Sequence, residues 1–158
     1  MKTGITIRRA MIDDLASICA LSQLLFEHDG QFTEEFNMSW SRSKEGQEFF
    51  TKQLKSRKSF ILLAQDGNKS VGYTHVTLDK FAWRAFNPIA EVVNLSIAPE
   101  YRGQGIGTAL FHEAKTLAKK RGAKRMSVSA VSADIRALNF YKRHGFKDFS
   151  VGMVVPLD

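Results

Sequence analysis

The prediction of a fold starts at the stretch Arg102-Gly103-Gln104-Gly105-Ile106-Gly107. An apolar run over residues 90–97 precedes it and predicts a strand, and apolar side chains at helical spacing follow it. In such a strand, turn and helix, backbone N–H groups and a helix N-terminus converge on one anion. Glycine permits positive φ and leaves no side chain between the backbone and that anion. The stretch therefore predicts a phosphate site, to which Arg102 would add positive charge.

Two common phosphate motifs do not match this turn. The dinucleotide-binding motif requires a glycine where Thr108 stands, and the P-loop requires Gly-Lys followed by Ser or Thr. A pattern of the type R-x-x-G-x-G/A arises by chance in about one chain of this size in ten. Taken alone, the turn is therefore also compatible with an ordinary connection between a strand and a helix.

The apolar periodicity along the chain predicts an α/β fold. Strands are expected at 5–9, 59–65, 71–78, 90–97, 125–131 and 147–155, and helices at 11–26, 43–54, 106–121 and 133–143. A helix between the fourth and fifth strands favours a parallel pair there. Because no linker or repeat divides the sequence, we expect a single domain over residues 1–158.

The composition is that of a globular domain without disulfides. Of the 158 residues 44% are hydrophobic, and Cys19 is the single cysteine. One cysteine cannot form an internal bridge, and no Cys/His cluster has zinc spacing, so we expect no metal and a reducing compartment such as the cytoplasm. The N-terminus lacks a signal-peptide pattern and the apolar runs are too short to cross a bilayer, so neither export nor a membrane partner is expected.

The formal net charge of +7 predicts an anionic partner, which nucleic acid, anionic lipid or a phosphate-rich cofactor would satisfy. A nucleic-acid-binding module is the less favoured interpretation, because no helix-turn-helix, zinc or RNP pattern accompanies the charge. The densest basic run, residues 119–125, falls at a predicted helix end, where it also complements the helix dipole.

Two blocks of sequence resemble one known family. The stretch from Leu95 to Leu110 resembles the acyl-CoA-binding motif of the GCN5-related N-acetyltransferase (GNAT) superfamily, and Ala137 to Phe146 is similar to its later A-x-x-F/L-Y-x-[KR]-x-G-F signature. The order of elements fits along essentially the whole chain. The resemblance implies a central twisted sheet of about six to seven strands, flanked by about four helices and splayed between the fourth and fifth strands. It also implies an N-acetyltransferase with acetyl-CoA as cosubstrate.

The resemblance assigns the cofactor contacts. Backbone N–H groups of Gly103, Gln104, Gly105, Ile106, Gly107 and Thr108 are implied to hold the pyrophosphate, beside Arg102. The strand edge at Leu95, Ser96 and Ile97 is implied to pair with the pantetheine arm, since a splayed edge leaves N–H and C=O groups that the cofactor's amides can satisfy. Asp134 stands where the family usually has a cofactor-binding asparagine, and an aspartate can accept a hydrogen bond but cannot donate one.

Tyr141 is the predicted general acid. It stands where the family usually has the residue that protonates the departing thiolate, and a phenol can protonate a thiolate without a prohibitive mismatch in pKa. The alternative is a tyrosine of the core, on the inner face of its helix.

Glu91 is the predicted general base. It lies eleven positions before Arg102, the spacing of the catalytic glutamate in the histone-acetylating branch, and simple alternation predicts that it shares a face with Val93 and Leu95. An ordinary carboxylate falls about six pKa units short of an ammonium, or about 8 kcal/mol for full proton transfer. An edge carboxylate in water is therefore the alternative.

The acceptor site is expected in residues 28–40 and 81–86, by analogy with other members of the superfamily. Carboxylates and aromatic rings in both stretches suit an organic cation, or else form a lid packed on the core: Glu34, Glu35, Phe36, Trp40, Phe81, Trp83 and Phe86. An acyl-CoA-binding regulator without chemistry also fits the cofactor turn. A homodimer is possible, because many relatives pair through their last strands.

Overall fold

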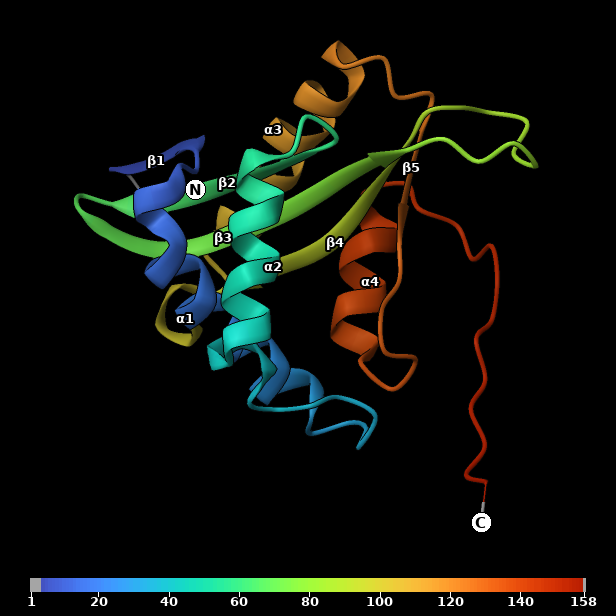
Figure 1. The fold of residues 1–158 in the computed structure, drawn as a ribbon, viewed down its shortest axis with the longest axis horizontal. Coiled ribbons are helices and arrows are strands. Elements are labelled where there is room, and N and C mark those ends of the chain that lie inside the picture. Colours follow the sequence, from blue (N-terminus) through green and yellow to red (C-terminus); the bar gives the residue numbers. More distant parts are fainter. Residues whose placement is uncertain (1–3, 158) are drawn as a thin grey trace.

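A five-stranded sheet in the order β1-β2-β3-β4-β5 forms the centre of the computed structural model, which describes residues 4–157 (Figure 1). Neighbouring strands are antiparallel except β4 and β5, which are parallel. A helical crossover between them makes the parallel pair possible, as predicted. The strands are β1 (Ile5–Arg9), β2 (Ser59–Asp66), β3 (Lys69–Asp79), β4 (Ile89–Ile97) and β5 (Arg125–Val128).

Helices cover both faces of the sheet, so the predicted α/β class is confirmed. Helices α1 and α2 pack on one face, against Ile61, Leu63 and Tyr73. Helix α3 packs on the other, against Leu62 and Val76 among others, and Figure 1 shows α2 in front of the sheet and α3 behind it. The helices are α1 (Leu15–Asp29), α2 (Lys44–Lys55), α3 (Ile106–Lys120) and α4 (Ile135–Arg143), with 3-10 turns η1 (Ile12–Asp14), η2 (Trp40–Arg42) and η3 (Pro99–Tyr101).

A β-bulge in β4 corrects the predicted alternation along that strand. Val92 pairs with Val76 and Asn94 with His75, so Val93 is an extra residue without a partner on β3. Val92 and Leu95 consequently lie on the same face, in the core beneath α3. Glu91, opposite Thr77, points to the other face. The expectation that Glu91 and Leu95 share a face is therefore wrong, because the bulge reverses the alternation.

The sheet opens between β4 and β5, as the resemblance implied. The two strands pair only from Ile89 with Arg125 to Val92 with Val128. Beyond that point, residues 94–97 of β4 have a strand neighbour only on the β3 side. The backbone edge left at this opening is the wall of the candidate site.

The last part of the described chain departs from the prediction. Residues 147–157 form no strand, so the sheet has five strands within residues 4–157 rather than six or seven. Figure 1 shows this segment running away from the sheet. β5 is four residues long, and its outer edge has no strand neighbour within residues 4–157. Among residues 4–157, no helix combines the length and apolar character that a membrane span requires.

Candidate active site

A cavity of about 700 Å³ lies at the opening between β4 and β5. Its walls come from the glycine turn with the start of α3, residues 93–97 of β4, residues 128–131 at the end of β5, and the facing ends of α1 and α4, with Phe36. The chain therefore brings the predicted cofactor turn and Tyr141 to one site, although 34 or more positions separate Tyr141 from Gly107.

The glycine turn has the backbone conformation of an anion site. Gly103 and Gly105 have φ of 74° and 78°, in the left-handed region that favours glycine, and Gly105 directly precedes α3. The first hydrogen bond into the helix runs from Ala109 N–H to Gly105 C=O at 3.0 Å. Within the described chain, no acceptor is recorded for the N–H groups of residues 103–108. These groups are available to a phosphate at the positive end of the helix dipole.

The residues of this turn do not all face the cavity. Gly103, Gly105, Ile106, Gly107 and Thr108 line it, whereas Gln104 does not and donates its side-chain amide to Glu100 C=O at 3.0 Å.

Arg102 lines the cavity and holds the end of β4. Its Nε donates to Ile97 C=O at 3.0 Å, so this carbonyl, which was predicted to meet the pantetheine arm, already has a partner. Burial and the neighbouring Arg136 lower the pKa of Arg102, and Asp134 opposes them. Leu95 and Ser96 also line the cavity, on the stretch of β4 that β5 leaves uncovered.

Tyr141 lines the cavity from α4. Burial raises the pKa of its phenol, and the carboxylates of Asp29 and Asp134 raise it further. The rings of Phe140 and Phe146 stand edge-on to it at 5.2 and 5.5 Å. The phenol is thus held protonated across the neutral pH range.

Glu91 lies outside the cavity wall. The bulge at Val93 turns it to the α1 and α2 face, between Thr77 of β3 and Ser127 of β5. The structure does not bring Glu91 together with Tyr141 and the glycine turn.

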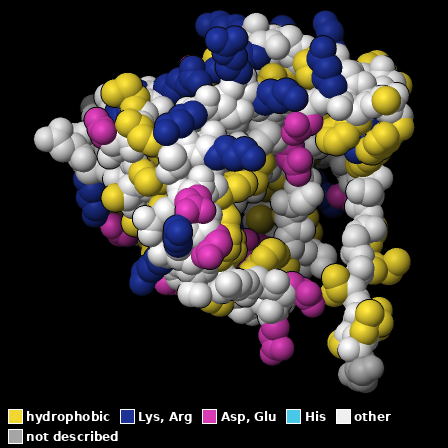
Figure 2. Space-filling model, viewed as in Figure 1, with side chains coloured by type: hydrophobic (Ala, Val, Ile, Leu, Met, Phe, Trp, Pro, Cys, Tyr) yellow, Lys and Arg dark blue, Asp and Glu magenta, His cyan; other side chains and the backbone are white. Residues whose placement is uncertain are grey.

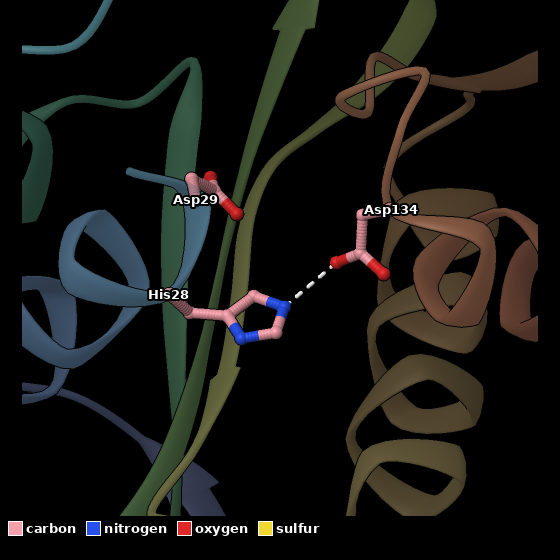
Figure 3. Close-up of side chains that lie close together, drawn as sticks. All are labelled: His28, Asp29 and Asp134. Atoms are coloured by element: carbon pink, nitrogen blue, oxygen red, sulfur yellow. Dashed lines mark hydrogen bonds and ion pairs between the residues drawn. The ribbon is translucent and has the colours of Figure 1, made fainter. Parts of the chain in front are cut away.

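Asp134 is the buried N-cap of α4. Its Oδ1 accepts from Ala137 N–H at 3.0 Å, and its Oδ2 accepts from His28 Nε2 at 2.7 Å (Figure 3). Burial disfavours the charge on Asp134, but the hydrogen bonds from Ala137 and His28 outweigh it and lower the pKa of the carboxyl. Asp134 therefore belongs to the cavity as a charged acceptor, bound to a histidine that the sequence analysis did not single out.

His28 and Asp29 lie at the end of α1, beside Asp134. The sequence did not predict that these three residues come together. Ligand atoms of all three lie within 4.8 Å of one another, the one such group of His, Cys, Asp and Glu in the part of the chain that the structure describes. Burial raises the pKa of Asp29, as does Asp134, while His28 lowers it. A histidine and an aspartate at the end of a predicted helix were the available signal, but these two residue types at a helix end do not by themselves indicate a site. The absence of a metal stays a prediction.

The aromatic residues proposed for the acceptor site divide between three places. Phe36 lines the cavity. Trp40 packs into the core against Phe26 and Phe49, as the lid alternative expected. The aromatic rings of the 81–86 loop lie outside the cavity and stack with arginines of the protein itself. The guanidinium carbon of Arg84 is 4.5 Å from the ring centre of Trp83, and that of Arg125 is 3.8 Å from the ring centre of Phe86. Glu34 and Glu35 are exposed and outside the cavity wall as well.

Known proteins share both the sequence pattern and the fold. Residues 22–146 match the family model described as the acetyltransferase (GNAT) family. The chain is 27% identical over 146 residues to an uncharacterised N-acetyltransferase of Methanocaldococcus jannaschii. The alignment covers 92% of this chain and 62% of that protein. It is 25% identical over 150 residues to the spermidine N(1)-acetyltransferase of Thermoplasma acidophilum. That alignment covers 91% of this chain and 89% of the relative.

A solved structure agrees with the topology. The aminoglycoside acetyltransferase meta-AAC0020 from an uncultured soil metagenomic sample, solved in complex with trehalose, matches 99% of this chain and 99% of its own with a TM-score of 0.77 and 23% identity. The family match includes the glycine turn and the block around Tyr141 that suggested the resemblance. This chain therefore belongs to the acetyltransferase (GNAT) family.

Proposed function

We propose that this chain, acting as one domain, transfers the acetyl group of acetyl-CoA to a primary amine of a small molecule or peptide, by direct attack in a ternary complex. The observation that carries the proposal is the continuous cavity. Its wall includes both the unsatisfied amides of the glycine turn and Tyr141 with two carboxylates. A cofactor held by the turn and bound along β4 would present its thioester inside the same cavity as Tyr141.

Each part of the cavity supplies one requirement of the reaction. The N–H groups of residues 103–108 would bind the pyrophosphate, with Arg102 beside them. The backbone of Leu95 and Ser96 would pair with the pantetheine amides. Tyr141, kept protonated by its surroundings, would deliver a proton to the thiolate as the C–S bond breaks. Glu91 remains a candidate base only through intervening water, since it stands outside the cavity wall.

The carboxylates that line the cavity favour a cationic amine as acceptor. Asp29 and Asp134 contribute carboxylates there, and Phe36 contributes an aromatic ring. Two similar proteins bear names that specify such amines, spermidine in one and an aminoglycoside in the other. Polyamines and aminoglycosides are therefore the first compounds to test, ahead of peptide amino termini.

Calorimetric titration and a thiol-release assay test this proposal together. Acetyl-CoA should bind with sub-millimolar affinity, and spermidine or an aminoglycoside should release CoA thiol with formation of a mass-shifted acetylated product. Binding of acetyl-CoA without thiol release from any amine of the panel would identify a regulator instead of an enzyme. Lack of binding would remove the acyl-CoA function altogether.

We further propose a cytoplasmic homodimer. A buried, unbridged Cys19 suits a reducing compartment. The dimer is supported by residues 147–157, whose apolar side chains are exposed along a segment that stands apart from the body of the molecule (Figure 2). A second copy offers a partner for this segment in the outer edge of β5, which ends the sheet within the described residues.

A further inference from the structure

The hydrogen bond between His28 and Asp134 joins two elements that face each other across the cavity. His28 comes from the last turn of α1 and Asp134 from the start of α4, 106 positions later in the sequence. Nε2 and Oδ2 are 2.7 Å apart, and the two side chains are only 22% and 6% exposed (Figure 3). A short, enclosed hydrogen bond to a carboxylate holds an imidazole in one orientation.

Asp134 also determines which nitrogen of His28 carries the hydrogen. One carboxylate oxygen caps α4 through Ala137 N–H, so the group cannot turn without uncapping the helix. An ionised carboxylate only accepts hydrogen bonds, so Nε2 of His28 bears a hydrogen, and in the neutral imidazole Nδ1 bears the lone pair. The edge of Phe32, with its ring centre 5.3 Å from that of His28, packs against the imidazole and supports this orientation.

The second nitrogen of His28 has the properties of a proton acceptor. Figure 3 shows it turned away from both carboxylates, and no hydrogen bond to it is recorded within residues 4–157. Of the four histidines in the sequence, His28 is the one that lines the cavity. An imidazole is ordinarily a stronger base than a glutamate by about two pKa units. The difference in pKa between the base and the substrate ammonium is therefore smaller for an imidazole.

Two carboxylates and a phenol lie around His28. Asp29 faces it from its own helix, and Asp134 faces it from α4. Tyr141 of α4 is neutral and is influenced by both carboxylates. The cations Arg102, Arg136 and Arg143 also line the cavity, and Arg102 interacts with Asp134. Two carboxylates beside a neutral phenol attract an incoming ammonium group.

We propose that His28 is the general base of the acetyl transfer and that Asp134 positions it, an inference that rests on the proposed function above. Nδ1 of His28 takes one proton from the substrate ammonium and passes it to solvent. The free amine forms the N–C bond while the C–S bond breaks, and Tyr141 gives its proton to the thiolate. The second proton lost by the nitrogen returns to Tyr141, so the products are an amide, CoA thiol and one released proton.

Replacement of His28 by glutamine tests the proposal through the pH profile. His28→Gln should lower kcat/KM at pH 7 by about 10²-fold, the usual contribution of a general base. Its rate should rise steadily with pH as free amine accumulates, without the bend that titration of an imidazole gives the unaltered enzyme. His112→Gln, at an exposed position of α3 outside the cavity, is the matched control and should keep the original profile.

Two further measurements separate a base from a merely structural residue. Added imidazole should raise the activity of His28→Ala at least tenfold. The affinity of both His28 variants for acetyl-CoA should stay within threefold of that of the unaltered protein. Nitrogen chemical shifts should report hydrogen on Nε2 of His28 in the unaltered protein, and a mixture of the two tautomers in Asp134→Asn. The same measurements after dialysis against EDTA should be unchanged.

The outcomes distinguish this inference from the proposed function. If the unaltered enzyme acetylates amines and His28→Gln keeps its rate and its pH bend, His28 is not the base, while the acetyltransferase function stands. If EDTA abolishes activity in the unaltered enzyme, the His28, Asp29 and Asp134 group serves a metal and the inference is wrong. If the unaltered protein binds acetyl-CoA but acetylates no amine, the proposed function and the inference both fail.

Discussion

At the scale of single residues, the surroundings of Tyr141 set what it can do. Burial and the carboxylates of Asp29 and Asp134 raise the pKa of its phenol, so it remains protonated through the range in which amines become reactive. A general acid of this kind must be present in its acid form at the moment the thiolate leaves. The same raised pKa means that an alkaline fall in rate, if seen, does not come from Tyr141.

Removal of the Tyr141 hydroxyl should therefore affect turnover more than binding. We expect Tyr141→Phe to lower kcat by about 10²-fold, with affinity for acetyl-CoA within threefold, because the ring that packs on Phe140 and Phe146 is retained. Lys142→Met, one position along α4 and exposed, controls for disturbance of the helix. Full activity of Tyr141→Phe would mean that water protonates the thiolate.

At the scale of elements, the glycine turn before α3 can be tested against a glycine just beyond the other end of that helix. Gly103 has φ of 74° and Gly122, beyond the end of α3, has φ of 86°, and an added Cβ meets nothing within 4 Å at either. An alanine at either position costs about 1–2 kcal/mol of backbone strain. Only Gly103 lies on the cavity, where N–H groups are available to the phosphates.

The two alanine variants should consequently lose similar stability but differ in binding. We expect Gly103→Ala to weaken CoA binding at least tenfold, or about 1.4 kcal/mol, and Gly122→Ala to leave it unchanged. Calorimetric titration with CoA, with thermal unfolding run in parallel, measures both effects. Equal affinities in the two variants would show that the turn is only a structural connection.

The sequence predicted some of these elements and contacts but not others. The glycine turn, the block around Tyr141 and the parallel crossover are local patterns, and all three lie where they were predicted. The bulge at Val93 is not readable from β4, because it depends on register with β3. The contact of His28 with Asp134 crosses 106 positions and has no characteristic spacing. Alternation also predicted a strand over 147–155, but a strand needs a neighbour to pair with, and alternation cannot supply one.

At the scale of the whole molecule, residues 147–157 have the pattern of a strand without a sheet. Every second side chain from residue 149 to residue 157 is apolar, and all five are at least 75% exposed: Phe149, Val151, Met153, Val155 and Leu157. Arg84 stacks on Phe149 at 4.5 Å and fixes the start of the segment at the 81–86 loop, beyond which the chain leaves its own sheet (Figure 1). An apolar row of this size is unfavourable in water unless it is covered.

Exchange of this segment between two copies would cover the apolar row. Each copy carries both an apolar row and an open β5 edge, so in a dimer with a two-fold axis each segment pairs with the β5 edge of the other copy. We expect light scattering at micromolar concentration to give twice the 17.8 kDa mass of one chain. Paired charges, as in Val151→Asp with Val155→Asp, should yield a monomer, since two carboxylates cannot enter an apolar row without a large desolvation cost. Ser150→Asp, on the other side of the segment, should remain dimeric. A monomeric unaltered protein at these concentrations would rule out the exchange and leave the apolar row for another partner.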